Sequence, residues 1–308
     1  MNLFRTAVAH LPGKALLLTL GMTALLATSL PAQTRVDLLP YAMHIKYNDT
    51  AYKEYGMVGG LYGYFGQGLS HTWEGDIGFT RMNFGEFADT VGTRRIITTP
   101  INVDQWDATL VYSNYSILNT KLRVGTHAIV SDDTLTDKSL VLFGGVNHYR
   151  SGYYNAGVDL YHTWYDNYLP GLKVLQATAT FGFFFGNYIT YGSFYAETRG
   201  HYIKHSQDVG FGETRFPSVE QSLFFYRNRL TLEAFLWSGY QAFGVMKDGF
   251  AVYNIAEKHL GGFGGSVRYN TSPKSSLKLS FSQGRFNEVG SGQISRSLSV
   301  MVLLGYTF

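Results

Sequence analysis

The sequence predicts an all-β fold, namely a transmembrane antiparallel up-and-down β-barrel of about 14 strands, with roughly 12 to 16 as the range. Three observations predict it: a composition rich in glycine and aromatic residues, an alternation of apolar and polar residues, and connections that alternate between short and long. The 308 residues include 35 glycines, and 16% are aromatic while only 15% are charged. This composition disfavours disorder, and glycine costs about 1 kcal/mol inside a helix. After the first thirty residues no apolar run reaches the length of about 20 residues that a helical span needs.

The N-terminal residues have the pattern of a secretory signal peptide. Arg5 and Lys14 precede an apolar stretch that is short for a membrane span, and Ala32 supplies a small residue for cleavage. A permanent N-terminal anchor is the alternative. The expected organisation is a signal peptide at 1–32, a short periplasmic segment at 33–40 and one barrel domain at 41–308.

Charge and cysteine content exclude several classes of protein. Without residues 1–32 the chain has 23 basic and 22 acidic residues, so nothing in its charge indicates a nucleic-acid partner. The absence of cysteine excludes disulfides, thiolate metal sites and a lipoprotein anchor. Packing and sheet hydrogen bonds must therefore hold the fold together.

Alternation of apolar and polar residues gives each strand one face for hydrocarbon and one for water. In the segment 71–81, for example, Trp73, Ile77 and Phe79 share one face and Asp76 lies on the other. The same pattern predicts strands at 41–48, 57–66, 71–81, 104–114, 118–130, 138–148, 153–164, 172–184, 189–203, 218–226, 229–241, 258–270, 276–284 and 294–308.

The connections between these strands alternate in length. Short turns at 227–228 and 271–274 contrast with long loops at 82–103, 204–217 and 242–257. Short turns on one side and long loops on the other are typical of a bacterial outer-membrane barrel, and an even strand count places both termini on the short-turn, periplasmic side. Lipid cannot satisfy unpaired edge N–H and C=O groups, so the first and last strands must meet.

A soluble β-sandwich would alternate too, but its outward face should be charged. Here the apolar face is aliphatic at mid-strand and aromatic toward the ends. Tyr188, Phe194 and Tyr202 lie along one strand, and Tyr154 and Trp164 lie on either side of the aliphatic residues of another. This arrangement matches the aromatic girdles at the two membrane interfaces and favours the barrel.

The last segment carries a resemblance to a known class. It has apolar residues at every second position from Val300 to Tyr306 and ends in Phe308. This resembles the C-terminal assembly signal of Gram-negative outer-membrane β-barrel proteins, with Tyr306 and Phe308 as its residues. The chain is similar to the porin-like class in length and pattern, and no motif assigns it to a family. The resemblance implies export to the outer membrane, contact with its lipid and lipopolysaccharide, and recognition by the barrel-assembly machinery.

Charged residues occupy many of the inward positions, which indicates a wet lumen because a barrel of about 14 strands approaches the size of aqueous channels. They either pair across neighbouring strands and stiffen the wall or act as a weakly selective filter. The candidates are Glu74, Asp76, Asp107, Lys121, Arg123, Asp159, Glu197, Arg199, Glu220, Glu233, Arg268 and Lys278, with Lys46 as a further basic residue.

Aromatic residues also fall at lumen positions in the second half of the chain. They either fill an oversized lumen or form a stacking track beside the carboxylates for sugar-like solutes. A register slip of one residue would turn all of them outward. They are Tyr161, Tyr191, Tyr195, Phe224, Phe235 and Trp237.

The longest connection, 82–103, is the best candidate for a segment that folds into the pore, with an exposed surface loop as the alternative. It contains Glu86, Asp89, Arg94 and Arg95.

A lipid-modifying enzyme is an alternative class, which needs a nucleophile beside a histidine on the lipid-facing rim. His162 lies there next to Trp164, but its expected neighbours are near Leu140 and Leu175, which cannot act as nucleophiles.

Two further histidines, His127 and His201, face the lumen, where a polar network is the simpler interpretation. The glycine run 261–265 lies within a strand and lacks the helix that a dinucleotide site needs, so it permits close packing of the wall.

The sequence therefore favours a channel for passive diffusion of small hydrophilic solutes in the Gram-negative outer membrane, with a sugar-like solute as a refinement. A lipid-modifying enzyme and a structural or export barrel with periplasmic or surface partners are the alternatives. We identify no catalytic residue, metal ligand or cofactor site, and the oligomeric state stays open.

Overall fold

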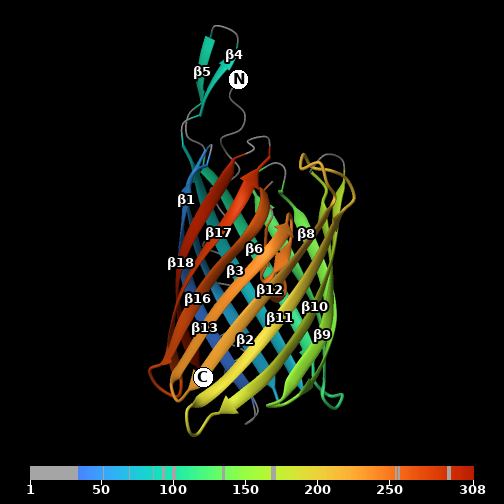
Figure 1. Ribbon diagram of the computed structural model, residues 1–308, viewed down its shortest axis with the longest axis vertical. Helices are drawn as coiled ribbons and strands as arrows, with labels where there is room; N and C mark the ends of the chain where they lie inside the picture. Colours follow the sequence, from blue (N-terminus) through green and yellow to red (C-terminus); the bar gives the residue numbers. More distant parts are fainter. Residues whose placement is uncertain are drawn as a thin grey trace.

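The computed structural model describes residues 34–308 except 51, 69, 86, 92–93, 99–101, 134–135, 168–170, 254, 256 and 290–292. The signal peptide expected at 1–32 lies outside the described residues. The described chain forms a closed antiparallel barrel of 14 strands, as predicted (Figure 1). The barrel strands are β1 (Thr34–Asn48), β2 (Lys53–Gln67), β3 (His71–Phe84), β6 (Asn102–Asn114), β7 (Thr120–Ser131), β8 (Ser139–Arg150), β9 (Tyr154–Tyr165), β10 (Leu172–Asn187), β11 (Gly192–His205), β12 (Arg215–Arg227), β13 (Leu230–Gln241), β16 (Glu257–Asn270), β17 (Ser275–Glu288) and β18 (Ile294–Thr307).

The first and last strands close the barrel. β1 pairs with β18 from Asp37 opposite Thr307 to Asn48 opposite Arg296, and the Phe308 N–H donates to the Val36 carbonyl. β1 begins at Thr34, not Tyr41, so residues 34–40, expected as a periplasmic segment, are part of the sheet. Alternation is weak there because Leu38 and Leu39 are adjacent apolar residues. Full pairing leaves no strand edge exposed to lipid.

The connections divide by length as expected. One end of the barrel has only short turns, such as Asn228–Arg229, and Phe308 lies at this end (Figure 1). The long connections, such as those that join β11 to β12 and β13 to β16, begin and end at the other end. The longest connection joins β3 to β6 and carries a hairpin of β4 (Phe87–Val91) and β5 (Arg94–Thr98). Figure 1 shows this hairpin beyond the barrel end, which agrees with the exposed surface loop and not with a segment folded into the pore.

The outward face of the barrel is apolar over most of its height. Trp106, Val300 and Leu304 are 49%, 51% and 55% exposed, although residues of these types are usually buried in soluble proteins. A continuous apolar surface of this size indicates a lipid environment. No helix among the described residues is long and apolar enough to span a membrane.

Glycines lie opposite several inward aromatic side chains. Phe235 pairs with Gly264 and Trp237 with Gly262, and a Cβ on either glycine would lie within 3 Å of the ring on the facing strand. The rings therefore lie flat across the neighbouring strand. This contact explains the glycine run 261–265, because close approach of a ring to the backbone requires the absence of a side chain.

Candidate functional site

The lumen is crossed by the connection that follows β13. We call residues 242–253 the inward loop; it contains β14 (Val245–Met246), the short 3₁₀ helix η1 (Lys247–Gly249) and β15 (Ala251–Val252). Val245 contacts Gln176 on β10, and the Phe250 ring lies 5.4 Å from the Tyr62 ring on β2. β2 and β10 are six positions apart in the ring of 14 strands, so the inward loop reaches nearly from wall to wall.

Gln176 fixes the backbone of the inward loop. Its Nε2 donates to the Val245 carbonyl at 2.6 Å, and its Oε1 accepts from the Val245 N–H at 2.8 Å. Both residues are buried, where an unpaired amide group costs about 1–3 kcal/mol. Gln176 therefore supplies both hydrogen bonds that join the Val245 backbone to the barrel wall.

Two buried apolar clusters also hold the inward loop against the barrel wall. Phe243 and Met246 of the inward loop pack in a buried cluster with inward residues of β9 to β12 and with Val209 from the 206–214 loop. Val245 packs in a second cluster, with Val111, Val141, Phe143 and Tyr161. Burial of such side chains stabilises the inward position of the loop by about 1.5–3 kcal/mol for each large residue.

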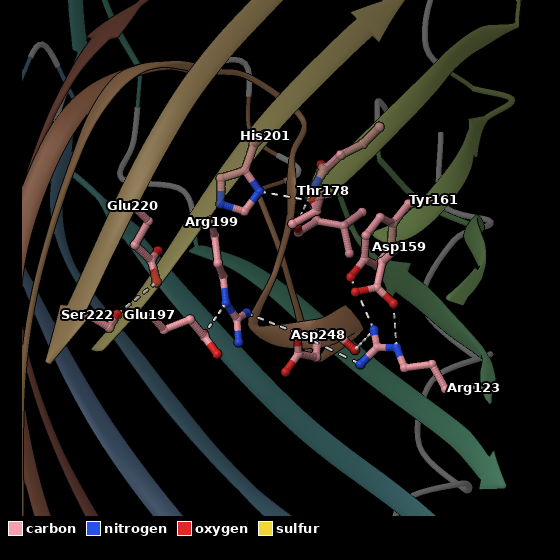
Figure 2. Close-up of polar contacts among 12 residues, drawn as sticks. Arg123, Asp159, Tyr161, Thr178, Glu197, Arg199, His201, Glu220, Ser222 and Asp248 are labelled. Atoms are coloured by element: carbon pink, nitrogen blue, oxygen red, sulfur yellow. Dashed lines mark hydrogen bonds and ion pairs between the residues drawn. The ribbon is translucent and has the colours of Figure 1, made fainter. Parts of the chain in front are cut away.

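The tip of the inward loop has an unusual backbone. Lys247 and Asp248 have φ of 47° and 59°, the left-handed region that non-glycine residues rarely adopt. This conformation places the Asp248 carboxylate between Arg199 of β11 and Arg123 of β7, which point toward it from opposite sides (Figure 2). Such strain persists only where the surroundings impose it, and it is often found at functional sites.

The two arginines share the Oδ1 atom of Asp248. Arg199 Nη1 lies 3.0 Å from it and Arg123 Nη1 3.8 Å, while Arg123 Nη2 also donates to the Asp248 carbonyl at 2.9 Å. Desolvation inside the barrel opposes ionisation of this carboxyl, but the positive charges of Arg199 and Arg123 outweigh it and hold the pKa of Asp248 below its usual range.

Each arginine also has a carboxylate partner on the barrel wall. Arg199 Nε donates to Glu197 at 2.6 Å, and Arg123 Nε lies 2.9 Å from Asp159. Gly145 lies between Arg123 and Asp159 in the sheet, and a Cβ there would lie 1.8 Å from the Asp159 carboxylate. The glycine thus leaves the space in which the ion pair forms.

All twelve charged residues predicted to line the pore lie on the inward side of the alternation. Lys46 is the exception among the predicted basic residues: it pairs in register with Leu298, on the exposed outer face, so its assignment to the lumen is wrong. The inward groups pair extensively. Lys278 contacts Glu233 at 3.1 Å, and the Tyr62 and Tyr41 hydroxyls donate to Glu74 and Asp76 respectively.

The predicted aromatic set divides into three. Tyr195, Phe224, Phe235 and Trp237 line β11 to β13, interleaved with Glu197, Glu220 and Glu233. Tyr161 is buried beneath the inward loop. Tyr191 is 56% exposed in the turn between β10 and β11, so its place in the lumen set is wrong; the turn at 188–191 interrupts the alternation that assigned it.

The three predicted histidines contact residues of the neighbouring strands or of their own strand. The His162 ring lies 4.1 Å from the Trp164 ring, and its partners in register are Leu142 and Leu175, not Leu140. In the lumen, His127 contacts Thr109 at 2.7 Å and Asp107 at 3.2 Å, whereas His201 contacts Thr178 at 3.0 Å.

Sequence reasoning missed the groups that fix the inward loop, Gln176 and Asp248. Gln176 is one polar residue on an inward strand face, and Asp248 lies in a loop without periodicity. One available signal was the apolar segment 242–246, since a loop exposed to water would not be expected to carry Phe243, Val245 and Met246 together.

A buried ion cluster lies at the long-loop end. Lys53 of β2 contacts Glu257 of β16 and lies 3.5 Å from Glu288 of β17, and these side chains are 5%, 5% and 10% exposed. The Lys53 ammonium also lies over the rings of Tyr47 and Phe286. The cluster joins β2 to β16 and β17 and so spans β1 and β18, the two strands that close the barrel.

A closed sheet with an apolar outer face and a polar lumen is the fold of an outer-membrane β-barrel channel, and it fits a Gram-negative outer membrane.

Solved structures of other outer-membrane channels are similar to this fold. The toluene transporter TbuX of Ralstonia pickettii superposes on this chain with a TM-score of 0.55 at 7% identity, and the match covers 91% of this chain and 90% of that chain. A TodX deltaS2S3 mutant, a monoaromatic hydrocarbon channel, gives 0.50 at 11% identity, with 90% of each chain covered. Acinetobacter baumannii Omp33 gives 0.47 at 8% identity, covering 89% and 99%. No family model and no curated protein matches the sequence.

Proposed function

We propose that the protein is a channel for passive diffusion of small hydrophilic solutes across the outer membrane. The observation that carries the proposal is a polar, charged lumen enclosed by an apolar outer face and crossed by the inward loop. A soluble scaffold would have no use for the apolar outer face, and a purely structural barrel would not need a charged interior. The inward loop narrows the path and limits it to small solutes.

Planar-bilayer recordings test this function directly. Purified protein in potassium chloride is expected to give discrete conductance steps, because a water-filled lumen joins the two compartments. Absence of steps together with turnover of phospholipid in detergent would instead support a lipid-modifying enzyme. Absence of steps with a partner that co-purifies in a fixed ratio would support an export or structural barrel.

The route to the membrane follows from the sequence pattern. Residues 1–32 would direct export, and Tyr306 and Phe308 would serve as the signal for the assembly machinery. Both side chains are exposed on the outer face, with ring centroids 4.9 Å apart, and are therefore accessible to a recognising protein.

A sugar-like solute is the refinement that the aromatic residues of β11 to β13 support. Phe235 and Trp237 lie flat against glycines and present a ring face to the lumen, beside the carboxylate Glu220. Replacing both with alanine is expected to reduce the current block caused by galactose, since stacking on aromatic rings holds a sugar in the pore. Tyr191→Ala, in the exposed turn, is the matched control. If galactose blocks the double alanine variant as strongly as it blocks Tyr191→Ala, the aromatic rings do not hold the sugar.

A further inference from the structure

We propose that Arg123 and Arg199 form a binding site for the carboxylate of a small organic acid, and that Asp248 occupies this site as an internal competitor. The proposal rests on the channel function and specifies which solutes the lumen recognises. It also makes the inward loop responsive to solute, since a bound carboxylate would displace the Asp248 side chain that helps to hold the tip of the loop.

The site is built from two strands that are four positions apart in the barrel, β7 and β11. The two guanidinium groups converge on one carboxylate oxygen, Asp248 Oδ1, at 3.0 Å and 3.8 Å (Figure 2). Arginine binds carboxylates through a rigid fork of N–H donors. On the wall, Glu197 accepts a hydrogen bond from Arg199 Nε, and Asp159 is the ion-pair partner of Arg123, so both arginines keep a wall carboxylate when Asp248 leaves.

Burial separates a fixed part of the site from an exchangeable part. The Arg123 side chain is 8% exposed and that of Arg199 22%, whereas the Asp248 side chain is 44% exposed. Solvent and solutes therefore reach the carboxylate more readily than its partners. Asp248 and the preceding residue, Lys247, are both left-handed, which costs about 1–2 kcal/mol per residue. Relief of this strain would offset part of the lost ion pairing when a solute takes the place of Asp248.

The wall beside Arg199 indicates what the rest of the solute looks like. Arg199 pairs in register with Glu220 on β12, and Glu220 pairs with Trp237 on β13. A carboxylate on the arginine pair would leave the body of the solute next to a hydrogen-bond acceptor and an indole ring. A hydroxylated body fits both groups, because hydroxyls donate to the acceptor and C–H faces stack on the ring. The geometry thus points to hydroxylated carboxylic acids.

Calorimetric titration of the detergent-solubilised protein tests the site with two probes that differ only in the carboxylate, galacturonate and galactose. Asp248→Asn keeps the size of the side chain and removes its charge. We expect it to tighten galacturonate binding by about tenfold, because the binding-competent site is no longer occupied, and to leave galactose binding unchanged. Adding Arg199→Gln to Asp248→Asn should abolish galacturonate binding, and Arg199→Lys should retain part of it.

Arg150→Gln, at the last residue of β8, is the control for loss of an arginine, because Arg150 has no contact with Asp248 among the described interactions. Heat-modifiable mobility reports folding of each variant. Galacturonate affinity that does not rise in Asp248→Asn overturns the proposal. An equal gain for galactose overturns it too, because general loosening of the loop would explain both. An equal gain for inorganic phosphate would overturn the assignment to organic acids.

Calorimetry does not depend on conduction, so the two proposals fail separately. Silent bilayers with a tighter galacturonate site in Asp248→Asn would refute the channel and support the site. Normal conductance steps without that gain would support the channel and refute the site.

Discussion

Gln176→Leu is expected to raise the mean single-channel conductance severalfold in planar bilayers. Leucine has a similar volume and keeps the packing on β10, but it removes both hydrogen bonds to Val245. The buried N–H and C=O groups of Val245 would then lack partners, at about 1–3 kcal/mol each. Since 1.4 kcal/mol corresponds to tenfold in an equilibrium, the docked position of the inward loop would lose at least about tenfold in relative population. Open intervals of higher conductance should become frequent.

Ser282→Ala is the matched control, because it removes a hydrogen bond of 2.6 Å between Ser282 and Ser299, both on the wall. Its conductance should equal that of the wild type. A variant in which a short glycine-serine linker replaces residues 245–252 should reach the conductance that Gln176→Leu shows in its open intervals. If neither change alters conductance, the inward loop does not limit the flow of ions.

The barrel could be predicted from the sequence because its main determinant is local. Lipid outside and water inside impose alternation on every strand, and the pattern can be read in any segment of about ten residues. The inner face of β3, with Glu74 and Asp76, follows from it directly. The ends of the strands are predicted less accurately. β1 begins at Thr34 and not at Tyr41, because the adjacent residues Leu38 and Leu39 interrupt the alternation.

The inward loop could not be predicted because its contacts join residues far apart in the chain. Gln176 and Val245 are 69 positions apart, and no local pattern marks either of them as the partner of the other. Length favoured the 82–103 connection as the inward segment, but length alone does not supply the apolar side chains that keep a loop inside a barrel. Phe243, Val245 and Met246 supply them in the 242–253 segment.

The candidate site was predicted in part for the same reason. Alternation identified Arg123 and Arg199 as inward residues, because both are on regular strands. It could not identify Asp248, which reaches them through a left-handed backbone at the tip of a loop. Nor could it show that a ring such as Trp237 lies flat across a facing glycine, since this depends on the register between β13 and β16.

Lys53→Met is expected to destabilise the barrel by about 3–5 kcal/mol, as removal of one partner from a buried ion cluster does. Lys53 lies between Glu257 and Glu288, and its loss leaves two neighbouring carboxylates buried without the ammonium. The cluster also bridges the seam between β1 and β18, so its loss weakens the barrel where the first and last strands meet. Urea titration of the protein in lipid vesicles, followed by tryptophan fluorescence, measures the free energy of unfolding.

Lys138→Met is the control, because the Lys138 side chain is 79% exposed and its contact with Asp137 measures 3.9 Å. An exposed pair of this kind contributes about 0–1 kcal/mol, so this variant should unfold like the wild type. Adding Glu257→Gln and Glu288→Gln to Lys53→Met should restore most of the lost stability, because neutral amides do not repel one another and can hydrogen-bond. If Lys53→Met unfolds at the same urea concentration as Lys138→Met, the cluster does not hold the seam. If the triple variant is as unstable as Lys53→Met alone, the loss comes from packing of the lysine stem and not from the charge of the two carboxylates.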